Sequence, residues 1–112
     1  MRLKSTANRR RVIYFSMVST VQTSKWYVYI LECVDGSLYT GITKNVDRRL
    51  HEHNKTKRAA KYTRARRPVQ IVASVVVNSM SSALKLERKV KKQKKKDKIT
   101  FLLEYEKNVE SI

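Results

Sequence analysis

The stretch WYVYILECVDGSLYTGITKNVDRRLHEHN, residues 26–54, decides the fold of this protein. Its first half contains two runs rich in β-branched and aromatic residues, separated by Asp35-Gly36. An Asp-Gly pair between two such runs predicts a tight β-hairpin, because glycine readily adopts the positive φ that the turn requires. We therefore expect strands over about 27–34 and 37–42. The first strand is apolar on both faces, which predicts a central strand covered on both sides.

The second half of the stretch changes from an alternating pattern to a helical one. Thr43 or Asn45 can cap a helix, because a short polar side chain accepts hydrogen bonds from the first turn. Val46 and Leu50 then share the buried face, since residues four apart lie on one side of a helix. We expect this helix to end near Asn54.

The same spacing brings candidate functional side chains together. Arg49 and His53 are also four residues apart, so they lie on one face of the predicted helix. Tyr29 and Tyr39 lie on the two strands that precede it. Gly41 weakens the second strand, and this indicates a close approach by another backbone or by a ligand.

The remainder of the chain predicts one more strand and two more helices. A β-branched run over 69–77 is typical of a strand, and helices are expected from about residue 81 and over 99–105. Residues 55–67 form a basic linker without a periodic apolar pattern, which we interpret as a functional or mobile loop. These elements predict an α+β fold, a three-stranded antiparallel sheet flanked by helices.

One compact domain accounts for most of the chain. We expect a basic, poorly ordered N-terminal extension over 1–24, the domain over 25–105 and a frayed C-terminus over 106–112.

The charge of the chain indicates a polyanionic partner. The 112 residues include 26 Lys and Arg against 9 Asp and Glu, a formal net charge of +17. Such an excess favours nucleic acid as the partner over an anionic membrane surface, and no apolar run is long enough to cross a bilayer. A single cysteine, Cys33, excludes an internal disulfide and is compatible with the cytoplasmic location that we expect.

The hairpin, the helix and a later carboxylate together resemble the GIY-YIG nuclease domain. The similarity rests on residues 27–29, on residues 39–41, on Arg49 ten positions after Tyr39, and on Glu87 in a later helix. It covers about residues 25–104 and is strongest to the small stand-alone bacterial members of the family. Tyr27 stands where the signature has its first glycine.

The resemblance implies a catalytic set, a glycine of the second signature half and a metal site. The implied catalytic residues are Tyr29, Tyr39, Arg49, His53 and Glu87. Glu87 would hold a single divalent ion, Mg²⁺ or Mn²⁺, and the tyrosines and the histidine would help to activate water. Gly41 matches the second-half glycine, and we expect it to contact the substrate.

Phosphodiester hydrolysis requires the same kinds of chemical group. A guanidinium can bind two phosphate oxygens and stays protonated, so Arg49 suits the scissile phosphate, although the adjacent Arg48 is an alternative. Mg²⁺ keeps several waters and can be bound through one carboxylate. Which of Tyr29, Tyr39 and His53 acts as the base stays open.

Each of these residues has a simpler explanation when it is taken alone. Tyr29 and Tyr39 are typical core aromatics of strands, His53 is typical of a helix surface, and Glu87 is an ordinary helical ion-pair partner for Lys91. The combined pattern favours the family over these separate explanations.

Basic side chains around this set are expected to contact the nucleic-acid backbone. The expected substrate-binding residues of the linker are Lys57, Arg58, Lys61, Tyr62, Arg64, Arg66 and Arg67. The lysine run adds Lys91, Lys92, Lys94, Lys95 and Lys96. Tyr62 either stacks on an unpaired base or packs on its own domain.

The resulting hypothesis is a metal-dependent endonuclease acting on DNA or RNA, with DNA favoured. The alternatives are a non-catalytic nucleic-acid-binding module on the same fold and a basic structural protein of a ribonucleoprotein. We expect a monomer without membrane association. The sequence names no protein partner.

Overall fold

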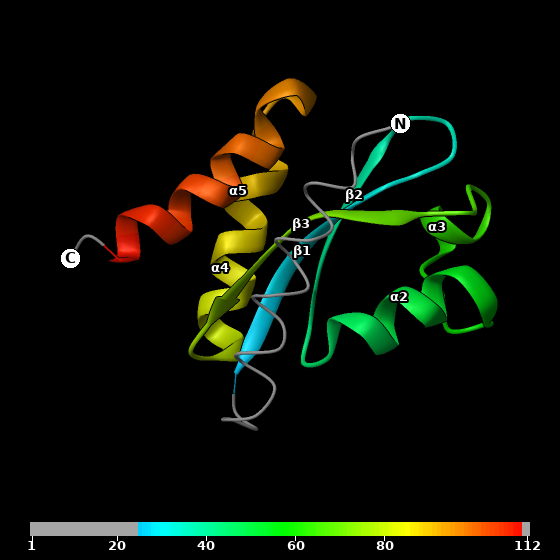
Figure 1. Ribbon diagram of the computed structural model, residues 1–112, viewed down its shortest axis with the longest axis horizontal. Coiled ribbons are helices and arrows are strands. Elements are labelled where there is room, and N and C mark those ends of the chain that lie inside the picture. Colours follow the sequence, from blue (N-terminus) through cyan, green and yellow to red (C-terminus); the bar gives the residue numbers. More distant parts are fainter. Residues whose placement is uncertain (1–24, 111–112) are drawn as a thin grey trace.

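A computed structural model describes residues 25–110 of the chain, with side chains up to residue 105, and it confirms the α+β fold class. Three antiparallel strands form a sheet in the order β2-β1-β3, with helices packed on both of its faces (Figure 1). The predicted N-terminal extension, 1–24, lies outside the described residues. None of the described helices is long and apolar enough to cross a membrane.

Strand β1, Trp26–Glu32, is the central strand, as its two apolar faces predicted. Val28 and Ile30 point to one face and Tyr27 and Tyr29 point to the other, and all four are buried. Alternate residues of a strand point in opposite directions, so β1 contributes to both cores of the molecule.

The hairpin that joins β1 to β2, Leu38–Thr43, has the predicted turn. Gly36 adopts a φ of 86°, a conformation that other residues rarely adopt. The Asp35 carboxylate accepts hydrogen bonds from the Ser37 amide at 3.0 Å and from its hydroxyl at 2.6 Å. These bonds hold the turn and lower the pKa of Asp35.

Strand β3, Gln70–Val77, pairs with the other edge of β1. The register shifts between Ile30 and Leu31, where β3 carries a bulge. The bulge changes which face the following residues occupy. As a result Ala73, Val75 and Val77 pack in one core, and Ile71 packs in the other.

Helices α4, Met80–Lys91, and α5, Lys95–Glu110, cover one face of the sheet (Figure 1). Ser79 caps α4 by accepting a hydrogen bond from the Ser82 amide at 3.1 Å. The buried side chains of α4 are Ala83, Leu86 and Val90. Helix α5 extends past residue 105, where the sequence predicted the domain to end.

Helix α2, Val46–Lys55, lies against the opposite face, with Asn45 as its N-cap. The linker after it was predicted to be an irregular loop, and this prediction is wrong in one part. Residues Lys61–Arg64 form a short helix, α3, whose Thr63 is fully buried. A short helix formed around one buried polar residue leaves no periodic apolar pattern for sequence reasoning to detect.

The segment around α3 is tied back to α2 by polar side chains. Arg67 donates from Nε to the backbone oxygen of His53 at 2.7 Å and from a terminal nitrogen to the backbone oxygen of Thr56. Asn54 bonds both the amide and the carbonyl of Val69, at 2.8 and 3.0 Å. The Arg67 bonds satisfy carbonyl groups at the end of α2, and the Asn54 bonds tie the start of β3 to α2.

Candidate active site at the edge of the sheet

Gly41 creates the space in which the central phenol of the site lies. It pairs with Tyr29 across the hairpin, and the Tyr29 ring lies over it. A Cβ atom at this position would be 2.6 Å from the Tyr29 hydroxyl oxygen and 2.8 Å from the adjacent ring carbon. From the sequence, we expected Gly41 to make room for another backbone or for a ligand. The structure shows that its close neighbour is the Tyr29 side chain.

Tyr29 begins a chain of buried hydrogen bonds. Its hydroxyl lies 2.9 Å from His53 Nε2, and His53 Nδ1 lies 2.7 Å from the Thr63 hydroxyl. The Thr63 hydroxyl donates its proton to the backbone oxygen of Ala60 at 3.0 Å. A hydroxyl has only one proton to donate, so His53 Nδ1 must carry the proton of its bond to Thr63. His53 Nε2 is therefore an acceptor, and the Tyr29 hydroxyl donates to it.

Burial keeps this chain uncharged. Burial, reinforced by the nearby Arg49 charge, lowers the pKa of His53 to about 4. Burial also raises the pKa of Tyr29, and the neighbouring Tyr39 raises it further. A neutral histidine can accept from the phenol, and a protonated phenol can donate, so both shifts preserve the direction of the chain.

Arg49 lies beside this chain and is held in place from several sides. One terminal nitrogen donates to the Glu52 carboxylate and to the backbone oxygen of Arg58, each at 2.9 Å. Burial opposes the charge of Arg49, but hydrogen bonds with Glu52 and with the Tyr29 phenol raise its pKa overall. Arg48 is exposed and only approaches Glu52 at 3.9 Å. Of the two adjacent arginines, Arg49 is therefore the one that lies in the site.

Tyr39 is the half-buried phenol of the site. Its ring meets the His53 ring edge-on at a centroid distance of 5.3 Å, and it stacks on Tyr62 at 6.2 Å. The Arg66 guanidinium lies 3.8 Å from the centroid of the Tyr62 ring. Tyr62 thus packs on its own domain, which was one of the two alternatives that the sequence left open.

Glu87 approaches the site from the other layer of the molecule. It projects from α4 and forms an ion pair with Lys91 at 3.2 Å. Burial and the neighbouring Tyr39 are the larger causes of the raised pKa of Tyr29, and the Glu87 charge adds to them. The two layers meet at β2, an edge strand, where a cavity of about 330 Å³ is lined by Tyr39, Tyr62 and Lys91.

The oxygen donors of the site fit a largely hydrated hard cation. Within residues 25–110 no group of three His, Cys, Asp or Glu side chains gathers as a cation cage would require. Glu87 is a half-buried carboxylate whose ion-pair partner Lys91 lines the cavity, and Mg²⁺ is commonly bound through one or two carboxylates with waters completing its shell. Lys91 would have to release Glu87 for this to happen.

Three of the predicted substrate-binding arginines are used inside the protein. Arg64 donates to the backbone oxygens of Lys57 and Ala59, and Arg66 donates to Asp35 and to the Tyr62 backbone oxygen. Arg67 closes the end of α2 through its bonds to two backbone oxygens there. Lys57, Arg58 and Lys61 are exposed and retain side chains directed to solvent.

Two residues of the site were missed by the sequence analysis. Glu52 lies one helical turn from Arg49, so its role as a partner was available from i,i+3 spacing. Thr63 is ten positions from His53 in a segment without periodicity, so no sequence signal pointed to it.

Comparison with known proteins agrees with this architecture. The family model described as the GIY-YIG catalytic domain matches residues 25–100. A UPF0213 protein of Syntrophus aciditrophicus is 51% identical over 79 residues, which cover 70% of this chain and 91% of that protein. A UPF0213 protein of Streptococcus agalactiae serotype V is 46% identical over 79 residues, covering 70% and 89% respectively.

A solved structure is also similar to this chain. The solution NMR structure of a UPF0213 protein from Bacillus halodurans is 46% identical, covers 66% of this chain and 78% of that chain, and superimposes with a TM-score of 0.42. With the family model and the relatives taken together, the chain belongs to the GIY-YIG domain family, within the UPF0213 proteins.

Proposed function

We propose that this protein is a divalent-metal-dependent endonuclease that hydrolyses phosphodiester bonds in nucleic acid, with DNA as the preferred substrate. The observation that carries the proposal is the Arg49 guanidinium, held by the Glu52 carboxylate and the Arg58 backbone oxygen. Arg49 lies on the helix whose His53 contacts Tyr29 and the half-buried Tyr39. Family membership implies a nucleic-acid substrate. The formal charge of +17 supports the same partner.

Arg49 is the proposed phosphate-binding residue. Only one of its terminal nitrogens is used by Glu52 and Arg58, and its side chain remains 24% exposed. The remaining N–H groups can donate to the phosphate oxygens as negative charge grows on them during attack by water. Because Glu52 and the Arg58 backbone oxygen already hold the guanidinium, little reorganisation is needed when the substrate binds.

Tyr39 is the proposed contact of the attacking water. Tyr29 and His53 are buried, and each hydrogen-bonds the other, so neither is available to a water at the surface. Tyr39 lines the cavity at the β2 edge and is in ring contact with His53. We assign Tyr29, His53 and Thr63 to positioning, since their hydrogen bonds run in series and the His53 ring contacts Tyr39.

Glu87 is the proposed metal-binding residue. A divalent cation held there would supply positive charge to the phosphate and to the departing sugar oxygen. Glu87 itself contributes a carboxylate whose position is set by α4 and whose negative charge already acts on Tyr29. Displacement of Lys91 from Glu87 would leave its ammonium group at the wall of the same cavity.

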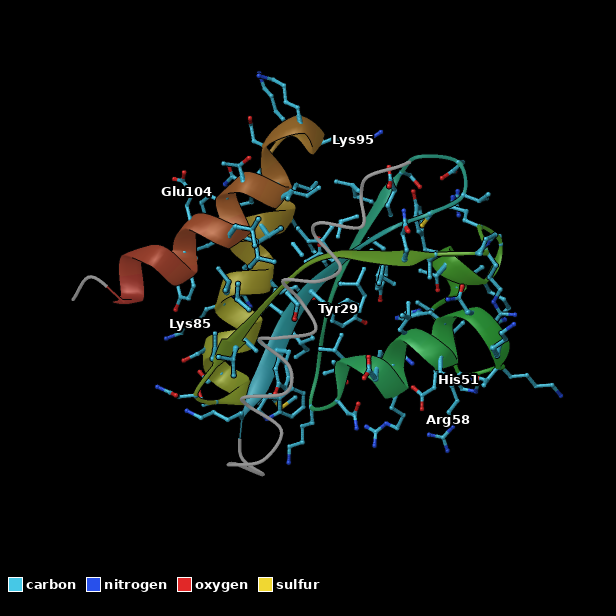
Figure 2. All side chains as sticks on the ribbon, viewed as in Figure 1. Tyr29, His51, Arg58, Lys85, Lys95 and Glu104 are labelled. Atoms are coloured by element: carbon cyan, nitrogen blue, oxygen red, sulfur yellow. The ribbon has the colours of Figure 1, made fainter. Side chains whose placement is uncertain are left out.

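The test is cleavage of labelled DNA and RNA by wild-type protein and by a Glu87→Gln variant, with Mg²⁺, Mn²⁺ or EDTA. We expect cleavage that needs the divalent ion and falls at least about 100-fold in Glu87→Gln. Glu104→Gln is the matched control, because Glu104 is an exposed carboxylate on α5 (Figure 2). Equal cleavage by wild type and Glu87→Gln would refute the metal role.

A second candidate function is binding without turnover. It is favoured by the Glu87–Lys91 ion pair, in which an ammonium group already neutralises the only carboxylate proposed for the metal. In that case Glu87→Gln would leave binding unchanged, no divalent ion would matter, and no cleavage would be seen on any substrate.

A further inference from the structure

Basic residues flank the candidate site on two sides, and the two groups differ in what their charges contact. On the α2–α3 side, the guanidinium groups of Arg64, Arg66 and Arg67 all bond to groups of the protein itself. Such groups fix the fold of the segment and have fewer N–H groups left for a partner. The predicted phosphate contacts of this segment are therefore reduced to the exposed Lys57, Arg58 and Lys61.

The corner between α4 and α5 leaves its charges in solvent. Lys94, Lys95 and Lys96 are exposed, and none of their ammonium groups forms a hydrogen bond or ion pair with another described residue. Their neighbour Lys98 instead donates to the backbone oxygens of Val90 and Lys91, at 3.2 and 3.0 Å. Lys98 thereby closes the end of α4 and holds the corner in place.

These three lysines line an open cavity rather than a convex surface. The cavity has a volume of about 620 Å³, and Leu38 and Ile99 provide apolar parts of its wall. Glu32 is an acidic residue on the same wall and lies 3.4 Å from the Gln70 side-chain amide. A basic rim over an apolar wall can accept both the phosphates and the sugars of a nucleic-acid strand.

This cavity leads to the candidate site. Leu38 lines both the 620 Å³ cavity and the 330 Å³ cavity that contains Tyr39 and Lys91. The two cavities therefore adjoin along the edge of β2. Figure 2 shows Lys95 on the α4–α5 corner at the top and Arg58 below α2, with Tyr29 at a height between them in this view.

We propose that a nucleic-acid strand bound at the candidate site continues along the edge of β2 and over the α4–α5 corner, with its phosphates on Lys94, Lys95 and Lys96. The inference depends on the proposed function for the identity of the partner as nucleic acid. The strand is placed over the α4–α5 corner and not over the basic segment 57–67. The distribution of charge in the sequence alone favoured both equally. Contacts of this kind recognise the backbone and carry no sequence preference.

The experiment compares three variants of the full chain that each lose three positive charges. The corner variant is Lys94→Gln, Lys95→Gln and Lys96→Gln. The segment variant is Lys57→Gln, Arg58→Gln and Lys61→Gln. The charge control, on exposed positions of α4, is Lys85→Gln, Arg88→Gln and Lys89→Gln. All nine side chains are exposed, so folding should be retained, and circular dichroism spectra verify it.

Binding is measured by fluorescence anisotropy in EDTA, over a series of salt concentrations, with labelled single-stranded DNA, duplex DNA and single-stranded RNA of one sequence. We expect the corner variant to bind roughly 10- to 100-fold more weakly at low salt. The slope of log affinity against log salt should fall by about 2 for single strands or about 3 for duplex. The other two variants should change affinity by no more than about 3-fold. The polymer with the largest corner effect identifies the bound form.

Each outcome separates this inference from the proposed function. A segment variant that weakens binding as much as the corner variant overturns the path, while wild-type cleavage would still support the endonuclease. A wild-type protein that binds none of the three polymers overturns both. Binding at the corner by a protein that never cleaves supports the path and overturns the proposed hydrolysis.

Discussion

The α2–α3 side and the α4–α5 side of the sheet bury different kinds of side chain. On the α2–α3 side, Tyr29, His53 and Thr63 are buried and hydrogen-bonded in series. On the α4–α5 side, the buried side chains of α4 are apolar, and the lysines at its end remain in water. On the α2–α3 side, buried polar side chains are held in fixed positions by directed hydrogen bonds. On the α4–α5 side, exposed lysines provide positive charge without a defined geometry.

This difference matches two requirements that the proposed cleavage of nucleic acid would impose. Positioning of a phosphate against attacking water tolerates little displacement, and buried, fully paired polar groups provide that precision. Attraction of a polyanion acts over longer distances and tolerates mobile side chains. The comparison predicts that substitutions on the α2–α3 side change turnover, stability and pH dependence, while substitutions at the corner change affinity and its salt dependence.

The largest expected effect comes from substitution of Arg49. It tests whether the position of a positive charge matters, or only its presence. Arg49→Ala should reduce cleavage about 100- to 1000-fold, because it removes the proposed donors to the phosphate. Arg48→Ala is the control, since Arg48 is adjacent, equally charged and exposed, and it should cleave nearly as wild type does. Single-turnover kinetics measure both. Similar losses in the two variants would mean that net charge, not position, matters on this side.

Gly41→Ala should destabilise the protein by about 1–3 kcal/mol, because the added Cβ collides with the Tyr29 phenol. Urea denaturation measures this change in the free energy of unfolding. A double-mutant cycle with Tyr29→Phe tests the cause, since removal of the hydroxyl removes the 2.6 Å contact and should recover part of the loss. A Gly41→Ala variant as stable as wild type would show that β2 can move away from the phenol.

Thr63→Val should cost about 1–3 kcal/mol of stability, because the N–H at His53 Nδ1 loses its acceptor. The nitrogen NMR shifts of the His53 ring report the tautomer, which should be protonated at Nδ1 in the wild type. Thr63→Ser keeps the hydroxyl and should keep that tautomer. Unchanged ring shifts in Thr63→Val would contradict a hydrogen bond that runs from His53 Nδ1 to Thr63.

The smallest expected effect is a pH dependence that arises from His53. Its pKa falls from 6.5 to about 4 on folding, so between these values the unfolded chain binds a proton that the folded protein excludes. Stability is therefore complete above pH 6.5 and falls with decreasing pH, by up to about 1.4 kcal/mol per pH unit.

Denaturation of wild type, His53→Asn and His51→Gln across this range isolates that contribution. His51→Gln is the matched control because His51 is exposed on the same helix, and His53→Asn should reduce the slope. Equal slopes in wild type and His53→Asn would show that the imidazole is protonated in the folded protein.

Regular periodicity explains which parts of the fold could be predicted. The β-branched and aromatic run over 27–34, the Asp35-Gly36 pair and the i,i+4 pattern of α2 identified the central strand, the hairpin and the helix, because these signals are local in the sequence. The resemblance to the GIY-YIG domain then singled out Tyr29, Tyr39, Arg49 and His53 on these elements. The structure brings the four together, with Glu87 approaching from the opposite layer.

The segment around α3 could not be predicted for the opposite reason. Its conformation depends on single polar contacts, such as Thr63 with His53 and Arg66 with Asp35, that join residues far apart in the chain. Composition alone made these arginines look like contacts for a ligand. Only the hydrogen-bond partners of these side chains show which arginines stabilise the fold and which remain available to bind phosphate.

Strand β1 contributes side chains to both layers. Val28 and Ile30 face one side, and Tyr29 between them faces the other. A shift of this strand caused by poor packing under α4 would move the phenol with it. Genetic screens for lost cleavage should therefore recover substitutions at Val28 and Ile30, which line no part of the pocket. Such alleles would lower stability as well as cleavage, because both side chains are fully buried.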